Sequence, residues 1–178
     1  METAKERFLI ATSVANEENA LRNCVLASFR RNKIYSKNAA GAQRWELRQS
    51  LKHKLAMLGA KYIDGSVSER EHETNILTLA DALSEEYGEI LVNGRFNIGT
   101  SQKALNLYLK FLWCLGRLPT PPHHCPVDRV VLSGLSVNGA WTRLDDIATY
   151  RAWIAMIRET AGEQPLSEWE LEMWNGTL

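Results

Sequence analysis

The segment GTSQKALNLYLKFLWCLG, residues 99–116, constrains the fold more than any other stretch of the chain. Thr100 or Ser101 can cap the first turn of a helix here, and Gly116 can end its last turn. Beyond the first turn almost every residue is apolar, so the helix would be hydrophobic on nearly all sides. A helix of this kind is normally buried, and we expect it to run through the middle of a domain.

Three polar residues interrupt this apolar helix at positions i, i+3 and i+7: Lys103, Asn106 and Lys110. Residues at this spacing lie on one face of a helix. A polar stripe on an otherwise apolar, buried helix is unusual. The pattern therefore predicts that these side chains line a cleft.

The segment HCPVDRVVLSGL, residues 124–135, follows this helix and predicts a second, shorter one. Pro126 favours an extended entry, and Asp128 stands where an N-cap residue is expected. The positive end of a helix favours the charged form of a carboxylate, which can then stabilise positive charge in a transition state. Ordinary helix capping also explains Asp128. We expect Lys103 and Asp128 to meet.

The rest of the chain is predicted to be helical as well. Hydrophobic residues recur at helical spacing, and no segment shows the alternation of a strand. The predicted helices cover residues 18–32, 40–59, 69–91, 143–162 and 165–174. Capping-box patterns start two of them, Ser68 with Glu71 and Ser167 with Glu170. No linker or repeat divides the chain, so we expect an all-α fold: one compact helical bundle over residues 1–178.

A hairpin turn joins two of these helices over residues 94–99. Gly99, Thr100 and Ser101 follow the turn and open the next helix. Backbone N–H groups at such a position can bind a phosphate. We therefore expect Gly99, Thr100 and Ser101 to contact the phosphates of a ligand's backbone.

This arrangement resembles the helix-hairpin-helix DNA glycosylases, in particular the 8-oxoguanine glycosylases and their compact archaeal relatives. The resemblance covers roughly residues 76–135: Ile98-Gly99 and then Lys103 are similar to the lysine-bearing helix of the family, and residues 125–128 (CPVD) to its Val-Pro-Val-Asp-like segment. The hairpin is atypical, because residues 97–99 read Asn-Ile-Gly where the family has Gly-hydrophobic-Gly. The stretch from the lysine to Asp128 is also longer, with its surplus in the loop RLPTPPHH.

The resemblance implies excision of a modified base from DNA without a cofactor. Lys103 would attack the sugar carbon C1′ as the base leaves, and the resulting Schiff base can cut the strand. Asp128 would stabilise the positively charged sugar, and Lys110 is the reserve nucleophile. If an activated water attacks instead, the protein is a glycosylase without strand cleavage.

An extruded base needs a pocket with hydrogen-bonding and stacking groups. The residues that we expect to bind it are Asn106, Lys110, His123, His124 and Trp141. The sequence does not distinguish an oxidised purine from a bulky phage-type base, so base-excision repair and antiphage defence both stay open.

The charge along the sequence is uneven, although 21 basic residues balance 21 acidic ones overall. Residues 22–61 carry ten basic side chains and one acidic side chain, a net charge of +9. Such a segment can follow a phosphate backbone, and we assign Arg44 and Arg48 to that contact. The alternative is that the segment pairs with residues 63–91, which carry eight acidic side chains and one basic side chain.

Other classes of protein find little support in the sequence. The three cysteines form no CxxC pair, and His123-His124-Cys125 lacks a second ligand cluster, so we expect reduced thiols and no metal. The start METAKERFLIATSV has no signal-peptide pattern, and no stretch reaches the roughly 20 apolar residues of a membrane span. We expect a cytoplasmic monomer that acts on DNA containing a modified base. The competing class is a non-catalytic helical module that binds nucleic acid or protein.

Overall fold

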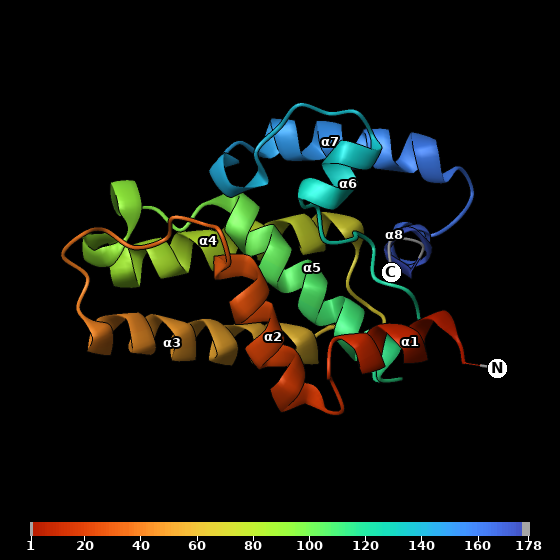
Figure 1. The fold of residues 1–178 in the computed structure, drawn as a ribbon, viewed down its shortest axis with the longest axis horizontal. Helices are drawn as coiled ribbons and strands as arrows, with labels where there is room; N and C mark the ends of the chain where they lie inside the picture. Colours follow the sequence, from red (N-terminus) through yellow and green to blue (C-terminus); the bar gives the residue numbers. More distant parts are fainter. Residues whose placement is uncertain (1, 176–178) are drawn as a thin grey trace.

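The computed structural model describes residues 2–175, and within them it has eight α-helices, three single-turn 3-10 helices and no β-strand (Figure 1). The α-helices are α1 (Ala4–Ala11), α2 (Glu17–Phe29), α3 (Gly41–Ala60), α4 (Glu69–Tyr87), α5 (Ile98–Cys114), α6 (Arg129–Gly134), α7 (Ile147–Ala161) and α8 (Leu166–Asn175). The 3-10 helices are η1 (Gly88–Ile90), η2 (Val92–Gly94) and η3 (Trp141–Arg143). The all-α prediction is confirmed.

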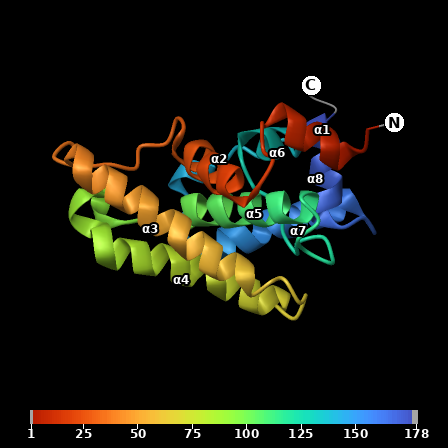
Figure 2. The ribbon, with the colours of Figure 1, turned by 90° about the horizontal axis from the view of Figure 1, so that it is seen from below.

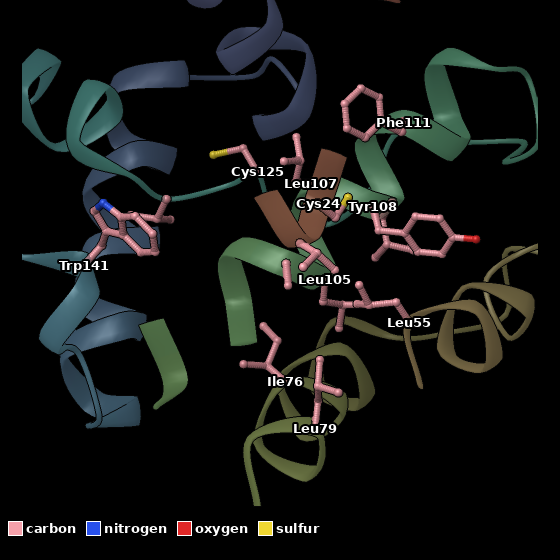
Figure 3. Packing of buried hydrophobic residues seen from close by; sticks show 14 of the residues in the cluster. Cys24, Leu55, Ile76, Leu79, Leu105, Leu107, Tyr108, Phe111, Cys125 and Trp141 are labelled. Atoms are coloured by element: carbon pink, nitrogen blue, oxygen red, sulfur yellow. The ribbon is translucent and has the colours of Figure 1, made fainter. Parts of the chain in front are cut away.

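Helix α5 forms the centre of the fold, as its composition predicts. All its residues are buried, and α1, α2, α3, α4 and η3 pack against it. Figure 2 shows α3 and α4 side by side along one flank, with α1 and α8 near the other end of α5. Leu55 of α3, Ile76 and Leu79 of α4, and Cys24 of α2 converge on α5 in one apolar core (Figure 3).

The start of α5 differs from the prediction. Asn97 is the cap, because its Oδ1 accepts the N–H of Thr100 at 2.8 Å, and neither Thr100 nor Ser101 fills that position. The Thr100 hydroxyl donates to the same Asn97 oxygen, whereas the Ser101 hydroxyl donates to Ile76 O at 2.6 Å. The helix therefore begins at Ile98, and Lys103 stands in its second turn. Gly116 does follow the helix end, in a left-handed conformation with φ +74°.

Helix α4 begins at the predicted capping box and ends before the predicted limit. Ser68 and Glu71 each bond the other's backbone N–H, as the pattern requires. The helix stops at Tyr87, four residues early, because η1 and η2 turn the chain tightly toward α5. Asn93 and Gly94 adopt left-handed backbones with φ of 56° and 66° in that turn.

The second predicted capping box is wrong. Helix α8 begins at Leu166, so Ser167 lies inside it and donates its hydroxyl to Pro122 O at 2.7 Å. The Glu170 carboxylate accepts instead from Lys110 Nζ at 2.6 Å. A buried ammonium needs a counterion, and this requirement outweighs capping.

Gly99 brings η3 directly onto the first turn of α5. A Cβ at this position would lie 1.7 Å from Trp141 O, so only glycine permits the contact. The Gly99 N–H also donates to Leu144 O at 2.8 Å. These contacts fix Trp141 beside α5.

Within residues 2–175, no helix combines the length and the apolar character needed to cross a lipid bilayer.

Candidate functional site

A pocket of about 540 Å³ lies between α2, α5, α6 and η3. Its charged lining residues are Arg30, Arg31, Lys103, Asp128 and Arg129, and its other walls include Trp141, Thr142 and Val130. The three arginines are exposed, whereas the side chains of Lys103 and Asp128 are only 10% and 26% exposed. The pocket thus has a partly buried ion pair and a cationic rim.

The predicted meeting of Lys103 and Asp128 is confirmed. Lys103 Nζ donates to Asp128 Oδ2 at 2.5 Å. The other carboxylate oxygen, Oδ1, caps α6 by accepting from Val130 N at 2.9 Å and Val131 N at 3.2 Å. Asp128 is therefore an N-cap and an ion-pair partner at the same time.

The electrostatics of the pocket keep Asp128 ionised. Burial acts to raise the pKa of this carboxyl, but the Lys103 ammonium and the two helix N–H groups outweigh burial and lower the pKa overall. A permanent carboxylate beside an apolar wall is suited to stabilising a developing positive charge.

Two amide side chains of α5 hold the segment that carries Asp128. Gln102 Nε2 donates to Val127 O at 2.6 Å, and Val127 N donates to Gln102 Oε1 at 3.1 Å. Asn106 Nδ2 donates to Cys125 O at 3.0 Å. Gln102 was not identified from the sequence as a residue of the site. The available signal was its position next to Lys103, which matches the position of Val127 next to Asp128.

Asn106 is fully buried and takes no part in lining the pocket. Its Oδ1 lies 2.9 Å from His72 Nε2, and its Nδ2 lies 3.0 Å from Tyr150 Oη. Because Asn106 Oδ1 can only accept, His72 Nε2 must carry the proton, and His72 Nδ1 then accepts from the Tyr62 hydroxyl at 2.8 Å. The pKa of His72 lies well below its ordinary value, chiefly because burial disfavours the imidazolium.

His124 is buried on the other side of this network. Its Nε2 donates to Glu69 Oε1 at 2.9 Å, and its Nδ1 accepts from the Tyr150 hydroxyl at 2.9 Å. Burial lowers the pKa of His124 even though the Glu69 carboxylate opposes the shift. Bonds from His124 and Arg158 lower the pKa of Glu69 to about 2. His124 therefore ties α4 to α7 and does not reach the pocket.

Lys110 and His123 also lie away from the pocket. The side chain of Lys110 is 1% exposed and bonds Glu170, with Nζ 4.0 Å from the centre of the Phe8 ring. His123 is exposed and bonds Val67 O through Nε2 at 2.7 Å. Of the seven residues expected to act on or bind a base, the structure brings together Lys103, Asp128 and Trp141.

The three backbone N–H groups expected to bind phosphate already have partners. Gly99 N donates to Leu144 O, Thr100 N to Asn97 Oδ1, and Ser101 N to Asn97 O. These residues lie inside the first turn of α5 and are buried beneath their neighbours. We therefore leave all three N–H groups out of the site.

Arg44 and Arg48 lie outside the pocket and hold Tyr35. Arg44 Nε donates to Ala39 O at 3.0 Å with its guanidinium 5.0 Å from the Tyr35 ring, and Arg48 Nε donates to Tyr35 Oη at 3.1 Å. The arginines of the basic segment that do line the pocket are Arg30 and Arg31, in the connection between α2 and α3.

The basic segment is mostly not neutralised by the acidic helix. Among residues 2–175, Lys54 with Glu86 is the one ion pair between the two segments, at 3.0 Å. The other acidic side chains of α4 that form ion pairs do so with arginines from later segments, Arg95, Arg151 and Arg158. The rim of the pocket therefore keeps its positive charge.

Arg31 has a backbone conformation that is unusual for a long side chain, with φ +58°. A left-handed backbone costs a residue other than glycine roughly 1–2 kcal/mol. Such strain occurs often at functional sites. The strained residue stands in the pocket lining.

The cysteines agree with the expectation of free thiols. Cys24, Cys114 and Cys125 are buried and unpaired. In the described part of the chain, no group of three or more His, Cys, Asp or Glu side chains is placed to hold a metal ion.

Comparison with known proteins identifies no matching family model, no similar curated protein and no similar solved structure. The function must therefore be inferred from the chemistry of the residues themselves.

Proposed function

We propose that this protein is a DNA glycosylase of the helix-hairpin-helix type, which releases a modified base by cleaving its N-glycosidic bond. The observation that carries the proposal is the partly buried Lys103–Asp128 pair in a pocket bordered by Trp141 and three exposed arginines. An amine, a carboxylate and an aromatic wall are the groups that such a reaction needs, and the rim suits a polyanion.

Asp128 acts on the sugar. When the glycosidic bond breaks, its electron pair leaves with the base and C1′ of the sugar becomes positively charged. The carboxylate is ionised and fixed by two helix N–H groups, so it stabilises that charge without having to reorient. Groups placed in this way typically contribute about 10²–10³ in rate.

Lys103 supplies the nucleophile if the protein both releases the base and cuts the strand. Its ammonium must first lose a proton. The amine then forms a bond to C1′ as the glycosidic bond breaks and the base leaves with the electron pair, and opening of the C1′–O4′ bond converts the adduct to a Schiff base. If Lys103 keeps its proton, water attacks C1′ and the strand stays intact. Strand cleavage thus depends on the proton of Lys103, whereas base release depends on Asp128.

The size of the pocket suits one extruded nucleotide. A volume of about 540 Å³ lies in the range of small-ligand sites, and Trp141, which is 9% exposed, is one of the lining residues beside the ion pair. Base selectivity would come from Trp141 and from Thr142, both of which η3 positions.

The test is base release, followed by mass spectrometry, from DNAs carrying oxidised, alkylated, deaminated or phage-type bases. Asp128→Asn keeps a capping group but removes the charge, so base release should fall at least about a hundredfold while the protein stays folded. Asp146→Asn is the matched control, because Asp146 caps α7 in the same way and lies outside the pocket.

The outcomes separate two classes of protein. Loss of release in Asp128→Asn alone supports the glycosylase. Absence of release from every substrate by the wild-type protein would sink this proposal and favour the non-catalytic binding module.

A further inference from the structure

A second hollow of about 910 Å³ adjoins the pocket. The two cavities share three lining residues, Arg31, Ala140 and Thr142, so they lie side by side. The second hollow is lined by the connection between α2 and α3, by the hairpin turn before α5, and by η3. Nothing in the proposed base-release chemistry uses it.

The charge of this second hollow is positive. Arg31, Lys33 and Arg143 line it, and none of them forms an ion pair within residues 2–175. Its one acidic residue, Asp145, is already bound to the fourth cation, Arg95, at 2.9 Å. Three cationic side chains are thus available to a ligand.

The polar groups between these cations are largely occupied. Asn32 Nδ2 bonds Ser28 O and Thr100 Oγ1, and Asn97 Nδ2 bonds Thr142 O. The lining includes no aromatic ring on which a base could stack. A ligand here would be recognised mainly by negative charge, which describes the sugar-phosphate backbone better than it describes a base.

We propose that the second hollow holds the phosphodiester backbone of the DNA strand next to the extruded nucleotide. This inference rests on the proposed function, because it takes the first pocket as the site of that nucleotide. The strand would pass from one cavity to the other beside Arg31. Arg31, Lys33 and Arg143 bind its phosphates, while Lys103 and Asp128 act on the sugar.

Substitution of Arg31 allows a test in which DNA affinity falls while the stability of the fold does not. Glycine tolerates the left-handed backbone of this position, so Arg31→Gly should keep or raise the melting temperature while removing one phosphate contact. Ser13→Gly is the matched control, because Ser13 has φ 55° and lies outside both cavities.

The experiment measures the affinity for an oligonucleotide with a tetrahydrofuran abasic-site analogue at several salt concentrations. This probe has no base at the central position, so binding does not depend on which base is excised. The variants are Arg31→Gly and the double variant Lys33→Gln/Arg143→Gln. The control is Lys37→Gln/Lys61→Gln, two exposed lysines of the basic segment that line neither cavity.

We expect the slope of log affinity against log salt to become shallower by about 0.7–0.9 for each phosphate contact removed. Ser13→Gly and the lysine control should keep the wild-type slope. Folded variants of Arg31, Lys33 and Arg143 that bind with wild-type affinity and slope would overturn the proposed strand path.

The two proposals fail separately. Asp128→Asn should bind the probe with the wild-type slope even where it releases no base. A wild-type protein that releases no base but shows the expected changes in slope would keep the strand path and lose the glycosylase. Base release by the wild-type protein, with no change of slope in the variants, would keep the glycosylase and overturn the strand path.

Discussion

The side-chain amide of Gln102 bonds both the backbone C=O and the backbone N–H of Val127. The bond from Nε2 to Val127 O and the bond from Val127 N to Oε1 imitate one rung of a β-ladder, built here between a helix side chain and an extended segment. Because Lys103 follows Gln102 and Asp128 follows Val127, this contact sets the register that brings amine and carboxylate together.

Gln102→Met should therefore separate the two charged groups as well as destabilise the protein. The change leaves the buried N–H and C=O of Val127 without partners, and each such group costs about 1–3 kcal/mol. Urea unfolding measures the loss of stability, and the rate of base release measures the effect of separating Lys103 from Asp128. Ser101→Ala is the control, since Ser101 is equally buried beside Gln102 but bonds Ile76 O; equal loss of base release in both variants would contradict the role of Gln102.

Glu170→Gln should be among the most destabilising single changes in the protein. Both partners of the Lys110–Glu170 pair are nearly inaccessible to water, and removing one charge from such a pair costs about 3–5 kcal/mol. Urea unfolding of the double variant Lys110→Met/Glu170→Leu should recover most of that loss, because no unpaired charge remains. A double variant no more stable than Glu170→Gln would show that the pair itself stabilises the fold.

The protein should lose stability as the pH falls below about 6.5. His72 and His124 have lowered pKa values in the folded state and an ordinary pKa of about 6.5 when unfolded, so the unfolded chain binds more protons in this range. Each histidine can reduce the free energy of unfolding by up to about 1.4 kcal/mol per pH unit. The stabilisation from Glu69 is present above its unfolded pKa near 4.5 and is lost as the pH falls toward its folded pKa of about 2.

Urea unfolding between pH 8 and 5 measures this effect. His72→Gln should flatten the pH dependence, whereas His53→Gln, on the exposed surface of α3, should leave it unchanged. A free energy of unfolding that stays constant over this range would contradict the assignment of two neutral buried histidines.

Borohydride trapping on DNA should depend on Lys103 alone if a Schiff base forms. Lys103→Gln should abolish the covalent adduct, because Lys110, the other candidate, is held by Glu170 and lies outside the pocket. Gel mobility measures the adduct, and Lys37→Gln, which removes an exposed lysine that lines neither cavity, is the control. An adduct that survives Lys103→Gln would require a different nucleophile.

The sequence predicts the helices well because their signals are local. Apolar spacing predicts α5, and the Ser68 and Glu71 pattern predicts the start of α4. The same pattern fails at Ser167 and Glu170, because their partners, Pro122 and Lys110, are distant in the sequence. Thr3 and Glu6 form a capping box that starts α1, and this start was readable from the sequence but was missed.

The site was only partly predictable for a related reason. The position of Asp128 before an apolar turn predicts an N-cap. Its pairing with Lys103 was predicted because the two residues stand near the starts of two consecutive helices. The polar stripe of α5 is misleading, because Asn106 and Lys110 find partners 44 and 60 residues away and do not face a cleft. The cationic rim depends on the path of the connection between α2 and α3, which no periodicity determines, so Arg30 and Arg31 were not distinguished from Arg44 and Arg48.

The meeting of α1 with α8 has a consequence for how the chain assembles during synthesis. Phe8 of α1 stacks on Phe111 with ring centres 5.0 Å apart and contacts Trp174 of α8 edge-on at 4.8 Å. The contacts of α1 are therefore complete only after α8 has been synthesised. At translation rates of about 5–20 residues per second, roughly 3–13 seconds separate the synthesis of Lys110 from that of α8. The apolar central helix therefore emerges well before its final cover, and part of its hydrophobic surface stays exposed for that interval.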